Sequence, residues 1–182
     1  MADPYPRFSY YPKNVTAPGW VEPLTASFSR ARPEIDTVKL PKGLTSDHVL
    51  QAVRPGLEAM GFEVESGKHA HEKVRRPVLF GDDGVPRVMY EIDAFHDDLG
   101  IALEIEAGRG AANNADYRDI LRTALILNSR YLALGMPRQY KFKNNGKTMT
   151  IPAYEHTRDR LDAVYASRRL RLPFDGVLLV GY

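Results

Sequence analysis

The chain has 182 residues, of which 43% are apolar and 26% are charged, a composition typical of one globular domain with a substantial core. It contains no run of about 18 apolar residues and no apolar leader near its N-terminus, so we expect no membrane span, no secretory signal and a cytoplasmic location. The absence of cysteine excludes disulfides, thiolate zinc sites and cysteine nucleophiles.

The first 45 residues differ in composition from the rest of the chain. They hold the only tryptophan and three tyrosines. Seven of the 13 prolines also lie here: Pro4, Pro6, Pro12, Pro18, Pro23, Pro33 and Pro41. Such a segment is too rich in proline for a helix and too aromatic for a free linker. We therefore interpret residues 1–45 as an extended arm that lies on the domain or on a second subunit, and residues 46–182 as an α/β domain.

The first helix is predicted to begin near Ser46, a favourable N-cap residue, and to end at Gly61. Val49, Val53 and Leu57 form its apolar stripe at helical spacing. Pro55 is awkward in a helix interior, so it predicts either a kink or a late start.

A second strong helical pattern covers residues 113–129. The face that we expect to be buried consists of Tyr117, Leu121, Ala124 and Leu125, widened by Ile120 and Leu127. The other expected elements are strands at 62–66, 77–81, 85–95, 100–108, 130–136 and 175–182, a hairpin around Asn144–Asn145–Gly146, and a helix at 154–170. This order predicts an α/β fold with a mixed central β-sheet flanked by helices.

The segment from Glu91 to Glu106 carries six acids and no lysine or arginine. The rest of the chain therefore has 17 acids against 25 basic residues, a formal charge of +8. A basic body around one acidic spot is typical of a metal-using enzyme that acts on polyanions, and it also arises from ordinary scatter of charge. The six acids are Glu91, Asp93, Asp97, Asp98, Glu104 and Glu106.

Alternation along the two acidic strands places their carboxylates on one face. If apolar residues pair with apolar residues across the hairpin, Asp93 lies opposite Glu104 and Glu91 lies opposite Glu106. Facing carboxylates destabilise a sheet unless a cation lies between them, and a divalent ion with oxygen ligands suits this place. A solvated polar face is the alternative interpretation, and a slip of one residue in the pairing would separate the acids.

Asp93, ten intervening residues and then Glu104-Ile105-Glu106 resemble the motif of the PD-(D/E)xK nuclease superfamily. In that family an Asp on one strand and a D/E-x-K sequence on the adjacent strand hold Mg²⁺ beside the scissile phosphate. The order of helix, antiparallel strands, helix and strand over residues 46–136 is also similar. The resemblance implies a restriction endonuclease-like core for the α/β domain.

Two positions depart from the family's pattern. Ile92 stands where the family has proline, which is a common deviation, and Glu106 stands where it has lysine. A subset of type II restriction enzymes carries Glu or Gln at this place, and residues 102–127 look like their strand–loop–helix segment. The motif here thus lacks the usual cation that polarises the attacking water.

The resemblance implies that Asp93, Glu104 and the carbonyl of Ile105 are ligands of Mg²⁺, with Mn²⁺ as a substitute. It also implies that Asp93, Glu104 and Glu106 are the catalytic residues. Glu106 would orient or deprotonate the attacking water, or help to hold a second metal. The further acids that we expect near the metal are Glu91 and Glu58.

Basic and polar side chains outside the acidic strands are candidate contacts to DNA, with ordinary solvated surface as the simple alternative. Arg109 also suits charge balance near the acids, and Asn113 also suits helix capping. The His-x-His spacing suits zinc but supplies only two ligands. The candidates are Arg109, Lys68, His69, His71, Lys73, Arg75, Asn113, Arg118, Lys143 and Lys147.

We therefore predict a Mg²⁺-dependent DNA endonuclease, of the type II restriction kind, that cuts double-stranded DNA as a homodimer. One alternative is a non-catalytic nucleic-acid-binding protein on the same fold. Another is a structural or assembly protein in which cations such as Arg109 neutralise the acids. The chain has no G-x-S-x-G, P-loop or G-x-G-x-x-G motif.

Overall fold

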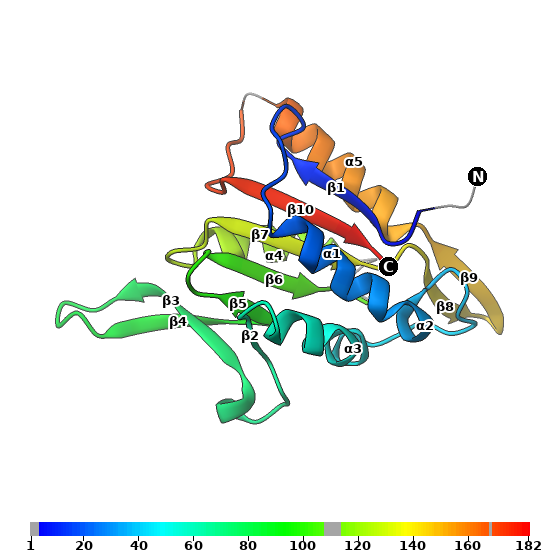
Figure 1. The fold of residues 1–182 in the computed structure, drawn as a ribbon, viewed down its shortest axis with the longest axis horizontal. Helices are drawn as coiled ribbons and strands as arrows, with labels where there is room; N and C mark the ends of the chain where they lie inside the picture. The colour runs from blue at the N-terminus through cyan, green and yellow to red at the C-terminus, as the bar shows by residue number, and fades with distance from the viewer. Residues whose placement is uncertain (1–3, 108–113, 168) are drawn as a thin grey trace.

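The computed structural model describes residues 4–107, 114–167 and 169–182, and a six-stranded mixed sheet forms its centre (Figure 1). The strand order is β1-β10-β7-β6-β5-β2, with β6, β7 and β10 parallel and β1, β5 and β2 joined antiparallel. The predicted α/β fold with a mixed central sheet is confirmed. The six strands are β1 (Arg7–Tyr11), β2 (Glu63–Val64), β5 (Ala94–His96), β6 (Ile101–Ile105), β7 (Tyr131–Met136) and β10 (Gly176–Gly181).

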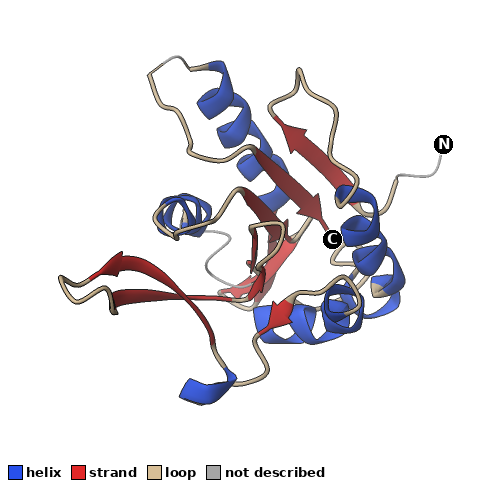
Figure 2. Ribbon diagram, turned by 60° about the vertical axis from the view of Figure 1, so that its left-hand side comes forward, coloured by secondary structure: helices blue, strands red, loops and turns tan. Residues whose placement is uncertain are grey.

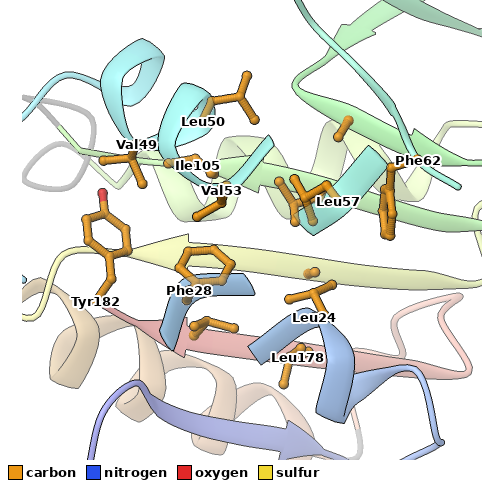
Figure 3. Close-up of a cluster of buried hydrophobic side chains, with 14 of the residues drawn as sticks. Leu24, Phe28, Val49, Leu50, Val53, Leu57, Phe62, Ile105, Leu178 and Tyr182 are labelled. Atoms are coloured by element: carbon orange, nitrogen blue, oxygen red, sulfur yellow. The ribbon is translucent and has the colours of Figure 1, made fainter. Parts of the chain in front are cut away.

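Helices cover both faces of this sheet (Figure 2). On one face, α1 (Val21–Arg30), α2 (Arg32–Ile35) and α3 (Ser46–Glu58) bury side chains such as Phe28 and Leu57 against Ile105 and Leu178 (Figure 3). On the other face, α4 (Ala115–Ala124) and α5 (Ala153–Ala166) pack against β7 and β10. Because helices lie on both sides, the central strands are buried throughout rather than alternating between core and water.

The proline-rich N-terminal segment is part of the core. β1 pairs with β10, and α1 and α2 contribute side chains to the same apolar cluster as α3. The prediction that this segment is extended and holds no helix was therefore wrong. Pro23 is the third residue of α1 and Pro33 lies at the start of α2, where a backbone N–H has no partner within the helix in any case.

The first predicted helix is confirmed as α3, with small differences at its ends. Its N-cap is Thr45, whose hydroxyl accepts a hydrogen bond of 3.2 Å from the N–H of His48. Pro55 lies inside the helix, which nevertheless continues to Glu58. Gly61 then reverses the chain with a φ of +95°, a conformation that favours glycine.

Helix α4 presents a different face to the core from the predicted one. Tyr117, Leu121, Leu125 and Leu127 are exposed, whereas the buried residues of the helix are Ala115, Asp116, Asp119, Ile120 and Thr123. The spacing of apolar residues predicts the wrong face of α4 because two acids, Asp116 and Asp119, are buried and interact with other side chains. Asp116 accepts hydrogen bonds from Arg160 and Thr157 of α5, and Asp119 turns toward the acids of β6.

Two hairpins lie outside the main sheet. One joins β3 (Val74–Phe80) to β4 (Pro86–Ile92), follows the short helix η1 (Ala70–Glu72), and extends away from the body in Figure 1. The other joins β8 (Tyr140–Asn144) to β9 (Lys147–Ile151) after β7 and matches the predicted hairpin. The predicted strand at 85–95 is divided by a bend at Asp93 into β4 and β5. No helix among the described residues is long and apolar enough to cross a membrane.

Candidate functional site

The bend at Asp93 brings this acid beside the end of β6. Ala94 pairs with Leu103, as apolar-to-apolar pairing predicts, and the carboxylate of Asp93 accepts a 2.7 Å hydrogen bond from the N–H of Ile105. Ile92 packs in the core on the α4 and α5 side of the sheet, whereas Ala94 packs on the α1 and α3 side. The direction of the side chains therefore reverses at the bend. Asp93 therefore lies where the hairpin meets the sheet, next to Glu104.

The carboxylates of Glu104 and Glu106 lie on the α4 side of the sheet, as the alternation of β6 predicts. Ile101, Leu103 and Ile105 pack on the α1 and α3 side, and the interposed Ala102 packs with the α4 and α5 cluster. Glu104 is 9% exposed although it carries a carboxylate.

The sequence predicts that Glu91 lies opposite Glu106. The antiparallel pairing with β6 is made by β5 alone and does not include these two residues. Glu91 instead pairs with Arg75 across the β3–β4 hairpin, with 2.7 Å between carboxylate and guanidinium. Its side chain still borders the site.

A polar pocket of about 260 Å³ forms around these acids. It is lined by Ser46, Asp47, Glu65, Lys73, Glu91, Ile92, Asp93, Glu104, Ile105, Glu106, Arg118, Asp119 and Arg122. The lining thus joins the start of α3, the end of β2, the hairpin, the end of β6 and one face of α4. Residues that are far apart in the sequence meet at this point because β4, β5 and β6 converge on it.

Burial raises the pKa values of the three motif acids. The pKa of Asp93 rises to about 7, mainly through desolvation, with further contributions from the charges of Glu65 and Asp119; the N–H of Ile105 acts in the opposite direction. Desolvation and the charge of Asp93 raise the pKa of Glu104 well above its usual range. Buried acids that cannot all ionise together need protons or cations, so the pocket is a strong candidate for cation binding.

Glu106 has a further acid as its neighbour. Burial and a hydrogen-bonding contact with Asp119 raise the pKa of Glu106 to about 8. Arg118 donates to Glu106 at 2.9 Å and to Asp119 at 3.1 Å. Sequence reasoning missed Asp119 because it lies on a helix face that apolar periodicity assigned to solvent.

Glu65 and Lys73 form a second feature that the motif alone does not reveal. The Lys73 ammonium pairs with the Glu65 carboxylate, and the N–H of Glu65 donates to the Asp93 carbonyl at 2.8 Å. Lys73, predicted as a DNA contact, therefore lies in the pocket. Glu65 lies directly after β2, a strand too short for its pairing with β5 to be predicted.

The other predicted site residues are scattered. Glu58 is exposed, 3.8 Å from Arg54, and is not part of the pocket lining. Lys68 contacts Asp47 at 3.7 Å, and the rings of His69 and His71, both exposed, stack at the start of η1. Lys143 and Lys147 are exposed on the β8–β9 hairpin. Arg109 and Asn113 lie outside the described residues.

The donor set fits magnesium rather than zinc. No three Asp, Glu or His side chains of the described residues lie close enough together to hold an ion unaided. Magnesium does not require such a cage, because it is usually held by one or two carboxylates together with waters and substrate phosphates. Asp93 and Glu104, with the carbonyl of Ile105, could supply such a partial set of hard oxygen ligands.

The fold is similar to that of the restriction endonuclease BglII. The crystal structure of BglII complexed with a DNA 16-mer has a TM-score of 0.50 to this chain at 11% sequence identity, covering 97% of this chain and 75% of that one. Free BglII has a TM-score of 0.48 at 10% identity, covering 97% and 78%. No protein-family profile and no curated protein matches the sequence. The likeness shows a restriction endonuclease-like fold.

Proposed function

We propose that this protein is a Mg²⁺-dependent DNA endonuclease of the type II restriction kind. The observation that carries the proposal is the junction of β4, β5 and β6, where Asp93 and Glu104 become buried neighbours beside the Ile105 backbone. The restriction endonuclease-like fold supports nuclease activity, and the DNA 16-mer bound to BglII supports DNA as the substrate.

Each acid has a separate role in this mechanism. Asp93, Glu104 and the Ile105 carbonyl would hold Mg²⁺, which supplies Lewis acidity and lowers the pKa of a bound water. The carboxylate of Glu106 would orient the attacking water and accept its proton, because its raised pKa suits a base near neutral pH. The Ile105 N–H donates to the Asp93 carboxylate, so this carboxylate is oriented before substrate binds.

DNA contacts are best supplied by the β8–β9 hairpin. Residues 137–151 contain four basic residues and no acid. Lys141 is engaged by the carbonyls of Val38 and Leu40, which leaves Lys143 and Lys147 on the exposed part of the hairpin. Such cations bind backbone phosphates through counterion release, without reading sequence.

The exposed face of α4 supports a homodimer. Tyr117, Leu121 and Leu125 are 47%, 66% and 51% exposed and are spaced by four residues, so they form one apolar stripe along the helix. An antiparallel two-fold contact through Leu121 would place Tyr117 against the partner's Leu125, which makes the stripe complementary to itself. A symmetric dimer also supplies the two active sites needed to cut both strands.

The decisive experiment is cleavage of mixed phage and plasmid DNA with Mg²⁺ or Mn²⁺. Wild type should produce discrete bands, while Asp93→Asn and Glu104→Gln should produce none. Glu58→Gln is the matched control, since this exposed acid lies away from the pocket lining. Bands from both pocket variants would refute the assignment of the site.

The other outcomes separate the alternatives. A smear that is lost in the pocket variants would retain a metal nuclease and remove restriction specificity. DNA binding without cleavage would favour the non-catalytic binding protein. Absence of both would favour the structural protein, and Asp93→Asn should then alter stability without any activity to lose.

A further inference from the structure

Lys73 brings an ammonium group into the pocket from outside the acidic strands. It directly precedes β3, and its side chain is 20% exposed. The loop before it is held in place, since the N–H of Ser66 donates to the Glu72 carbonyl at 2.9 Å and the Glu72 carboxylate accepts from the N–H of His69. The backbone at Lys73 is therefore positioned before any substrate binds.

Most of the hydrogen-bonding capacity of this ammonium is unused. A lysine ammonium has three N–H donors. Among the described residues, only the Glu65 carboxylate accepts from Lys73. Asp93 and Glu104 line the same pocket, and the charge of Lys73 opposes the rise in the pKa of Asp93. An anion bound beside Asp93 can therefore accept hydrogen bonds from Lys73 while the pair with Glu65 is kept.

The other two cations of the pocket lining are engaged by protein groups. Both belong to α4. Arg122 donates to the Glu91 carbonyl at 2.9 Å. Arg118 divides its donors between Glu106 and Asp119, and its side chain is 58% exposed. Lys73 is therefore the cation of this lining that has donors to spare and is also largely enclosed.

We propose that Lys73 is a catalytic residue that donates hydrogen bonds to the scissile phosphate, while Glu65 holds its ammonium in place. This inference rests on the proposed function. As water attacks, its oxygen bonds to phosphorus, the bond to the leaving sugar oxygen breaks, and the proton of the water passes to Glu106. Lys73 stabilises the negative charge of the phosphate in the transition state. The start of β3 thus supplies a positive charge that β6, which is followed by Glu106, lacks.

Simple neutralisation of Glu65 is the competing explanation, and a double variant separates the two. Lys73→Met should reduce kcat for DNA cleavage by about 10²–10³ and raise KM by less than about tenfold. If Lys73 only balances Glu65, removal of both charges in Lys73→Met/Glu65→Gln should restore cleavage. We expect the double variant to remain as slow as the single one. Lys73→Arg retains the charge and should keep about a tenth or more of the wild-type kcat.

Metal affinity gives a readout that does not depend on activity. Mn²⁺ is titrated into the full chain by calorimetry without DNA. Lys73→Met should bind the ion as tightly as wild type or more tightly, because the variant lacks a positive charge near Asp93. Weaker Mn²⁺ binding would show that Lys73 acts by ordering the metal ligands rather than by contacting the phosphate.

The matched control is Lys13→Met. Lys13 is an exposed lysine after β1, lies 4.3 Å from the centre of the Tyr11 ring and is not part of the lining of this pocket. Its replacement should leave kcat, KM and Mn²⁺ affinity unchanged. Circular dichroism and thermal unfolding verify that each variant is folded. If Lys73→Met unfolds because Glu65 is left unpaired, the neutral double variant is compared with Lys73→Arg instead.

The remaining outcomes separate this inference from the proposed function. Wild-type kcat in Lys73→Met would show that its ammonium does not act on the phosphate, and the proposed nuclease would remain intact. Restored cleavage in the double variant would reduce Lys73 to a partner of Glu65. Absence of cleavage by wild type would remove both proposals.

Discussion

The hydroxyl of Tyr182 donates a 2.7 Å hydrogen bond to the backbone carbonyl of Glu106. Tyr182 is fully buried, and its own backbone is bonded to Met136, Arg138 and the hydroxyl of Thr37. The Glu106 N–H in turn donates to Gly135 at 2.9 Å. The main chain at Glu106 is thus held from both sides by the ends of β7 and β10.

Tyr182→Phe should therefore destabilise the protein by about 1–3 kcal/mol, because it leaves a buried carbonyl without its donor. Urea unfolding measures the change. Tyr165→Phe is the matched control, since the buried Tyr165 hydroxyl has no hydrogen-bond partner and its removal should cost less than about 0.5 kcal/mol. Equal losses in both variants would show that the bond to Glu106 contributes nothing.

Asp93→Asn should stabilise the metal-free protein at pH 8 by about 1 kcal/mol or more, since it removes a buried charge whose pKa is raised to about 7. The amide oxygen can still accept from the Ile105 N–H, so the fold is kept. Addition of Mg²⁺ should raise the unfolding temperature of wild type and leave that of the variant unchanged. Stabilisation of the variant by Mg²⁺ would contradict the role of Asp93 as a ligand.

Stability of the metal-free protein should fall as pH rises from 5 to 8.5. Asp93 and Glu106 have folded-state pKa values of about 7 and about 8, above their ordinary values of 3.8 and 4.5. Across this interval the folded protein binds more protons than the unfolded chain, so the free energy of unfolding decreases with pH. Urea unfolding in EDTA measures the slope, which should become shallower in Glu104→Gln. A rise with pH would contradict the burial of these charges.

Leu121→Glu should convert a dimer into monomers, because it puts two like charges on the two-fold axis of the proposed contact. Sedimentation velocity measures the change. Leu170→Glu alters a comparably exposed leucine outside α4 and should leave the dimer intact. A wild-type monomer at all concentrations, with or without DNA, would rule out the α4 contact.

Replacing Lys143 and Lys147 together by Gln should weaken DNA binding equally for all sequences. Each lost phosphate contact should reduce the slope of log affinity against log salt by about 1. Lys13→Gln changes an exposed lysine after β1 and should not alter the slope. Fluorescence anisotropy in EDTA measures binding without cleavage, and an unchanged slope in the double variant would exclude the β8–β9 hairpin from the DNA contact.

Most of the central elements could be predicted because their patterns are local. The alternation of β6 separates Ile101, Leu103 and Ile105 from Glu104 and Glu106, and the structure retains that separation. The stripe of α3 is equally regular, so one proline did not obscure it. The helices α1 and α2 could not be predicted from the number of prolines alone. Pro23 and Pro33 lie in the first turns of these helices, where proline is tolerated.

The sequence by itself determined the α/β class, the strand faces and the spacing that joins Asp93 to Glu104. Only the tertiary structure decided that Asp119, Glu65 and Lys73 meet these acids. Burial of an acid depends on partners from distant elements, such as the contact of Asp119 with Glu106 or the bond of Asp116 to Arg160. The spacing of apolar residues predicts the buried face of a helix from hydrophobicity alone. The face that α4 buries also depends on which of its polar side chains find partners in the interior.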